Sequence, residues 1–303
     1  NTLGLPNNQG FDFFYGYNCQ RQAHTLYPMH LWKNDKREIL NNKNVAPHSN
    51  LPSDADPYDS KSYEDFELND YAPELMHNEA LAFIEKNKKN PFFLYYASPL
   101  PHVPLQAPRY WVNYYRKIIG DEEPFVGKSY FPNQYPKATY AAMISYLDEQ
   151  VGDIVNRLKE VGVYENTLII FTSDNGPETT WRKRIEKFGH HSNGIFREGK
   201  RSIYEGGHRV PFLVRWPAKV PAGKTSDFPV SSIDLFPTIM EATGAKLPKD
   251  RPFRNHVKFT YDDDPTRQGG MFRHHNRMVR YLLYLLGHPC GENEFLYVIL
   301  NDG

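Results

Sequence analysis

A short apolar run, Thr167-Leu-Ile-Ile-Phe-Thr-Ser173, ends abruptly in the turn-forming sequence Asp174-Asn-Gly-Pro177. Its length and its β-branched and aromatic residues are typical of a strand that is buried on both faces. Before it, between residues 140 and 158, apolar residues recur at steps of three and four, which predicts an amphipathic helix. A helix that leads into a buried strand indicates an α/β domain, in which ligand sites lie at the carboxyl ends of strands.

The same alternation of helix and strand continues on both sides of this segment. Residues 72–87 have apolar positions at helical spacing, and Pro91-Phe-Phe-Leu-Tyr-Tyr-Ala97 directly after them predicts a second buried strand. Residues 210–216 predict a third strand. Pro237 near the start and Gly244 just past the end bracket a short helix that includes residues 239–242. We therefore expect a three-layer α/β domain.

The two ends of the chain lack this regularity. Residues 1–71 are aromatic at first and then rich in Asn, Asp and Pro, which predicts loops with at most short strands. After Asp250 only residues 281–286 and 294–300 are apolar, without an obvious period. We therefore divide the chain into a main domain, residues 1–250, and a C-terminal region, residues 251–303, which could be the remnant of a small α+β subdomain.

Composition excludes several classes of protein. Hydrophobic residues make up 40% of the 303, which excludes a mainly disordered chain, and 36 Lys and Arg balance 36 Asp and Glu. This balance disfavours a nucleic-acid partner, so an anionic ligand has to be bound by a local cluster of charge. Two cysteines, Cys19 and Cys290, exclude a disulfide framework and a four-cysteine zinc site. No apolar run is longer than that of residues 281–286, which is too short to cross a bilayer.

The sequence Ser173-Asp174-Asn175-Gly176 is the first candidate site, because it directly follows a buried strand. Carboxylate and amide oxygens are hard ligands that suit Ca²⁺ or Mg²⁺, but calcium takes about six to eight oxygen ligands, so these two residues cannot form a site alone. The alternative interpretation is a simple turn, since Asp, Asn and Gly are common turn formers.

Two basic residues follow other strands or glycine-flanked loops. His102, in Pro101-His-Val-Pro104, could donate a proton or bind an oxyanion, or it could be a structural histidine. Lys200, in Phe196-Arg-Glu-Gly-Lys-Arg201, could reach an anionic group, or it could belong to a solvated basic loop. Other histidines, among them His24 and the pair His190-His191, lack the spacing of a zinc site.

Together, the order and spacing of these features resemble the sulfatase family of the alkaline-phosphatase-like superfamily. The resemblance covers roughly residues 9–250 and is closest to arylsulfatase-like enzymes of polysaccharide-degrading bacteria. The matching stretches are residues 9–17, 17–24, 91–97, 101–104, 147–152, 166–176, 199–200, 204–211 and 234–238.

The resemblance implies a fold, an activity and roles for particular residues. The fold would be a three-layer alkaline-phosphatase-like domain with a mixed, mostly parallel sheet, and the activity would be hydrolysis of sulfate monoesters of carbohydrate or aryl alcohols. Asp174 and Asn175 would bind Ca²⁺, and His102 and Lys200 would contact the sulfate and its bridging oxygen. The resemblance also implies a periplasmic or secreted location. Two further candidate substrate-binding residues are His191, on the loop before Lys200, and Arg21, within the matching stretch 17–24.

The chain also departs from the family pattern. Sulfatases attack with a formylglycine made from the Cys or Ser of a Cys/Ser-x-Pro-x-Arg motif, and an Asp-Asp pair near their start supplies further calcium ligands; neither occurs here. We therefore expect a sulfatase domain without its first part, inactive by itself. Two alternatives stay open: a phosphodiester or phosphonate hydrolase of the same superfamily with a different metal, and a non-catalytic carbohydrate-binding module derived from a sulfatase.

Overall fold

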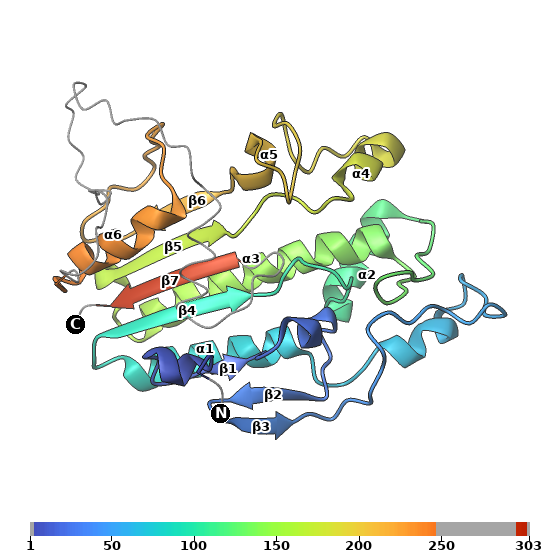
Figure 1. The fold of residues 1–303 in the computed structure, drawn as a ribbon, viewed down its shortest axis with the longest axis horizontal. Coiled ribbons are helices and arrows are strands. Elements are labelled where there is room, and N and C mark those ends of the chain that lie inside the picture. The colour runs from blue at the N-terminus through green and yellow to red at the C-terminus, as the bar shows by residue number, and fades with distance from the viewer. Residues whose placement is uncertain (1–2, 247–294, 302–303) are drawn as a thin grey trace.

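The computed structural model describes residues 3–246 and the strand at residues 295–301, and it has an α/β fold (Figure 1). The α-helices are α1 (Ala72–Asn87), α2 (Arg109–Ile119), α3 (Pro136–Glu160), α4 (Trp181–Phe188), α5 (Glu205–His208) and α6 (Leu235–Ala242). The strands are β1 (Tyr15–Gly16), β2 (His30–Lys33), β3 (Lys36–Ile39), β4 (Phe92–Ser98), β5 (Thr167–Ser173), β6 (Phe212–Arg215) and β7 (Phe295–Asn301). Short 3₁₀ helices cover Pro6–Gln9, Gln20–His24, Ser60–Phe66, Tyr164–Asn166 and Ser232–Asp234. The helices and strands predicted between residues 72 and 244 are confirmed.

The main sheet has the strand order β4-β7-β5-β6. β4 and β5 run in the same direction, with β7 antiparallel between them, and β6 is antiparallel to β5 (Figure 1). The expectation of a mostly parallel sheet is therefore wrong for the described strands. β7 comes from a distant part of the chain, and α4 and α5, between β5 and β6, lie beyond the end of the sheet rather than crossing its face.

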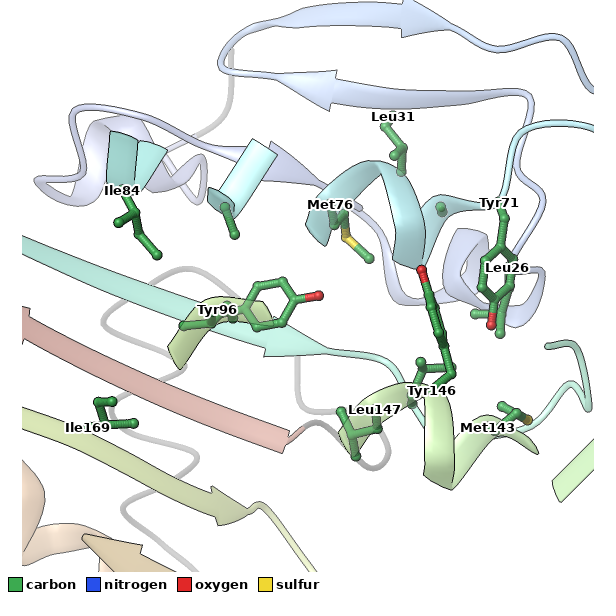
Figure 2. Close-up of a cluster of buried hydrophobic side chains, with 14 of the residues drawn as sticks. Leu26, Leu31, Tyr71, Met76, Ile84, Tyr96, Met143, Tyr146, Leu147 and Ile169 are labelled. Atoms are coloured by element: carbon green, nitrogen blue, oxygen red, sulfur yellow. The ribbon is translucent and has the colours of Figure 1, made fainter. Parts of the chain in front are cut away.

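One face of the sheet is covered by α1 and α3, which form the larger hydrophobic core (Figure 2). Ile84 of α1, Met143 and Leu158 of α3 and Leu100 after β4 are fully buried in it. A buried amide ties the three elements together: Gln150 Nε2 of α3 donates to the Pro73 carbonyl at 3.0 Å, and Tyr96 Oη of β4 donates to Gln150 Oε1 at 3.3 Å. Since these polar atoms are paired, their hydrogen bonds offset the cost of removing them from water and fix the helices against the sheet.

The other face of the sheet is covered by α6. Side chains of β5 alternate, so that Ile169 belongs to the larger core while Leu168 and Ile170 pack with Trp216 and Leu235 on the opposite face. This strand is therefore buried on both faces, as its uninterrupted apolar sequence predicted. Helices on both sides of the sheet also confirm the three layers.

Residues 3–71 are irregular, as predicted, apart from 3₁₀ helices and a small antiparallel sheet of order β1-β2-β3. No helix in the described part of the chain is long and apolar enough to span a membrane. The proposed boundary at residue 250 and the apolar residues 281–286 lie outside the described residues. Of the C-terminal region 251–303 the structure describes β7, which belongs to the main sheet.

Candidate functional site

Two glycine-containing loops meet beyond the carboxyl end of β5, on the side of the sheet where Figure 1 shows α4 and α5. Gly176 N donates to the Gly207 carbonyl at 3.0 Å. A Cβ on Gly176 would lie 1.8 Å from the Gly206 carbonyl oxygen, and one on Gly206 would lie 2.0 Å from the Glu198 carbonyl oxygen. Glycine is required at both positions, because any side chain would separate the loops.

The same packing brings the segment of Lys200 to the end of β5. Lys200 N donates to the Pro177 carbonyl at 2.8 Å, and its Nζ is buried. The residues on either side of this segment, Glu198 with φ +66° and Arg201 with φ +74°, have left-handed backbone conformations that are uncommon for side chains other than Gly, Asn and Asp. The Glu198 carboxylate forms an ion pair with Arg182. Lys200 therefore occupies a constrained loop against residues 174–177 rather than a freely solvated one.

A cavity of about 630 Å³ lies at these loops and collects several of the predicted residues. His102, Asn175 and His191 line it, together with Ser173 and Gly176. Asp174 and Lys200 do not line it; Asp174 lies between two lining residues in sequence, and the Lys200 backbone is bonded to the lining residue Pro177. Arg21 is exposed on the 3₁₀ helix Gln20–His24 and is not part of this wall.

His102 follows β4 and is 7% exposed. Its amide donates to the Pro99 carbonyl at 3.0 Å, and its Nδ1 forms a hydrogen bond with the Val103 carbonyl. A carbonyl can only accept, so Nδ1 carries the proton in this contact. Nε2 is then the nitrogen that can gain or lose a proton without breaking the bond to Val103.

A cluster of aromatic rings surrounds His102 and was not predicted as a unit from the sequence. The ring of His24 lies parallel to that of His102, with centroids 6.5 Å apart, and Tyr130 meets both rings edge-on at 5.6 and 6.0 Å. His48 contacts His24 and Tyr130 at the outer side of the cluster. His24 ends the stretch 17–24 that carries part of the resemblance, which is the only signal in the sequence that could have marked it.

The cavity wall carries more positive than negative charge. Arg184 and Arg209 line it together with three histidines, whereas Glu178 is the only carboxylate among its lining residues. Burial alone would raise the pKa of Glu178, but hydrogen bonds from Thr179 and Thr180 outweigh it and lower the pKa to about 2. Glu178 is therefore ionised at neutral pH, with its charge held by the turn that follows it.

The oxygen donors of Asp174 and Asn175 suit a calcium ion in kind but not in number. The two residues are adjacent after β5, and Asn175 Nδ2 donates to the Gly176 carbonyl at 3.0 Å. Within residues 3–246, no group of three or more His, Cys, Asp or Glu side chains could hold a metal ion. The two residues can therefore supply part of a calcium site, which needs about six to eight oxygens in all.

Comparisons with known proteins identify the family. The model of the sulfatase family matches residues 3–245. An N-acetylgalactosamine-6-O-sulfatase of Bacteroides thetaiotaomicron is 37% identical over 58% of this chain and 31% of its own length. An arylsulfatase of Hemicentrotus pulcherrimus is 30% identical over 82% of the chain and 38% of its own length. The chain thus spans about a third of the length of these curated relatives.

Solved structures agree with the sequence relatives. Ps i-CgsB, crystallised with k-i-k-neocarrahexaose, superimposes with a TM-score of 0.59 at 29% identity, over 83% of this chain and 49% of its own. A Bacteroides thetaiotaomicron protein described in connection with the metabolism of multiple glycosaminoglycans has a TM-score of 0.56 at 26% identity, over 82% of this chain and 54% of its own. The site after β5 and these similarities lead to one conclusion: the chain belongs to the sulfatase family.

Proposed function

We propose that this chain forms the sulfate-binding part of a sulfuric ester hydrolase that acts on sulfated carbohydrates. The observation that carries the proposal is that β4 and β5, which run in the same direction, bring His102 and Asn175 to one cavity, while Gly176 and Pro177 hold the loop of Lys200. The carbohydrate is favoured by the N-acetylgalactosamine sulfatase and the oligosaccharide complex among the similar proteins. Like other sulfatases, the protein would be periplasmic or secreted.

Each basic residue has a distinct task in this proposal. Cleavage of a sulfate monoester leaves negative charge on the bridging oxygen, and a protonated Nε2 of His102 would donate a proton there. The bond from Nδ1 to the Val103 carbonyl fixes the imidazole orientation for this step. The ammonium of Lys200, a compact charge on a constrained loop, would neutralise the sulfate oxygens that do not leave.

Calcium would complete the binding of the sulfate. Asp174 and Asn175 would hold the ion together with ligands from elsewhere in the protein, and the bound ion would supply positive charge that polarises the sulfate. The 303 residues contain no Cys/Ser-x-Pro-x-Arg motif that could provide the nucleophile. We therefore propose that this chain does not turn over sulfate esters alone, and that a non-catalytic carbohydrate-binding role is the alternative to test.

The experiment is a comparison of leaving groups in the complete protein. His102→Gln should lower kcat/KM about 10²- to 10⁴-fold for a sulfated sugar, whose alkoxide leaving group needs a proton. The loss should be much smaller for 4-nitrophenyl sulfate, whose leaving group is stable without one. Lys200→Met should lower kcat/KM for both esters alike, because it removes the positive charge that would neutralise the sulfate oxygens common to both.

His30→Gln on β2 is the matched control, since His30 does not line the cavity, and it should leave both rates unchanged. An equal loss with both leaving groups would remove the proton-donor role from His102. Binding of sulfated sugars without release of sulfate from any ester would contradict the proposed hydrolase and support a carbohydrate-binding module.

A further inference from the structure

The wall of the cavity contributed by α4 and the loop after it has no role in the chemistry proposed above. Residues 181–191 have the sequence Trp-Arg-Lys-Arg-Ile-Glu-Lys-Phe-Gly-His-His, with four Arg or Lys residues and one Glu. Of these residues, Arg184, His190 and His191 line the cavity that also contains His102 and Asn175. This wall therefore places a second set of basic side chains beside the sulfate site.

Arg184 is held in place by two contacts that leave its charge uncompensated. Its guanidinium stacks on the ring of Tyr140 in α3, 4.5 Å from the centroid, and its Nη1 donates to Ser192 Oγ at 3.4 Å. The His190 amide also donates to the Arg184 carbonyl at 3.3 Å, which fixes the loop against the helix. A guanidinium oriented in this way keeps donors for a carboxylate or sulfate oxygen.

Three neighbouring cations differ from Arg184 because they are already paired. Arg182 forms an ion pair with Glu198, Lys187 with Glu123, and Arg209 with Glu205 at 3.0 Å. Within the described part of the chain, no carboxylate forms an ion pair with Arg184. Glu178, the carboxylate that lines the same cavity, is instead engaged by Thr179 and Thr180. Arg184 is thus the cavity-lining arginine without an acidic partner.

The cavity is also larger than the space that one sulfate or carboxylate group occupies. Its volume of about 630 Å³ lies within the range of roughly 300–1,000 Å³ that holds whole small-molecule ligands. We infer that Arg184, with His190 and His191, binds a second anionic group of the substrate, a sulfate or a carboxylate, so that the substrate is a carbohydrate with at least two anionic groups. This inference rests on the proposed function, because it locates the second group relative to the sulfate ester at His102.

Calorimetric titration of the complete protein with three sugars tests the inference. The probes are N-acetylgalactosamine 6-sulfate, its 4,6-disulfate, and the 6-sulfated disaccharide that carries a uronic acid. The second sulfate or the carboxylate should tighten binding by about tenfold, the gain expected of a charge-assisted hydrogen bond. The two doubly charged probes distinguish a second sulfate from a carboxylate as the group that Arg184 binds.

Variants connect the gain to Arg184. Arg184→Gln should abolish the tenfold gain, and Arg184→Lys, which keeps the charge but not the planar pair of donors, should retain part of it. Lys183→Gln is the matched control: it removes the same charge from the next residue of α4, whose side chain does not line the cavity, and should keep the full gain. An unchanged unfolding midpoint of Arg184→Gln would show that its fold is intact, and hydrolysis of 4-methylumbelliferyl sulfate by Lys183→Gln at the wild-type rate would show that the control keeps the sulfate site.

Two results overturn the inference while leaving the proposed function in place. One is that the complete protein hydrolyses the aryl ester but binds the singly and doubly charged sugars with equal affinity. The other is a gain in affinity that persists in Arg184→Gln. If the complete protein neither hydrolyses the aryl ester nor binds any of the sugars, the proposed function and this inference both fail.

Discussion

Different interactions hold together two regions of the molecule: the core between α1, α3 and β4, and the loops at residues 174–211. The core consists of fully buried apolar side chains, such as Ile84 and Met143, packed against the sheet (Figure 2). The loops are joined by backbone hydrogen bonds, such as Gly176 N to the Gly207 carbonyl, at distances that leave no room for a side chain. The stability of the domain therefore depends mainly on the core, and the placement of the proposed sulfate-binding residues depends on the loops.

The largest expected effect is on the core. Ile84→Ala removes a fully buried side chain from α1 and leaves a cavity, which should lower the free energy of unfolding by about 2–5 kcal/mol. Ile144→Ala is the control, because Ile144 is 44% exposed on α3, and it should change the unfolding free energy by less than about 0.5 kcal/mol. Denaturant unfolding of both variants measures the difference. Similar losses in the two variants would contradict the assigned core.

The next effect is on the loops and should appear in activity rather than in stability. Gly176→Ala places a Cβ 1.8 Å from the Gly206 carbonyl oxygen. The loops have to separate, and a misplacement of about 1 Å at a catalytic group costs about 100-fold in rate. The measurement is kcat/KM of the complete protein together with its unfolding midpoint.

Gly152→Ala gives the control for the loop variant. It makes the same chemical change within α3, where a Cβ would meet nothing within 4 Å, and should stabilise the helix by about 0.5–1 kcal/mol without loss of activity. If Gly176→Ala kept full activity, the close packing of the two loops would not be what positions the site.

The smallest expected effect is the pH dependence of stability that comes from a buried histidine. Burial lowers the pKa of His77 in α1 below its usual 6.5, although the Asp153 carboxylate, 3.1 Å from Nε2, partly opposes this. The unfolded chain then binds a proton more readily than the folded one, so the stabilisation present above about pH 6.5 is lost as the pH falls below that value.

Unfolding at pH 7.5 and pH 5.5 measures this contribution. Between these pH values, the free energy of unfolding should fall more in the wild type than in His77→Gln. The difference between the two falls should be smaller than the loss expected for Ile84→Ala. An equal fall in both proteins would mean that His77 is not the group responsible.

The sequence predicted elements better than it predicted the relation between strands. The periodicity over residues 140–158 and the apolar run 167–173 identified α3 and β5, because burial on one helix face or on both strand faces leaves a direct pattern of residue types. The same patterns could not show that β7 lies between β4 and β5, since strand pairing between distant segments leaves no local signal. For this reason the predicted direction of neighbouring strands was wrong.

The site shows the same division. His102 and Asn175 were expected to act together and do line one cavity, whereas Arg21 was expected at the substrate and lies outside it. Arg184 was not singled out, because arginines on an exposed helix are common and this one is distinguished only in the folded chain, where it lines the cavity and packs on Tyr140. The ring of His24 beside His102 likewise depends on two segments that are far apart in the chain.

The sequence alone determined the class of fold, the helices α1, α3 and α6, the strands β4, β5 and β6, and the resemblance to sulfatases, since each depends on residue types at fixed spacing. It did not predict α2, α4 or α5. The tertiary structure decided the direction of the strands, the contact between the loops at Gly176 and Gly206, and the charged wall at Arg184. These features depend on which distant segments meet, and such meetings are fixed by packing of the whole domain rather than by any local pattern.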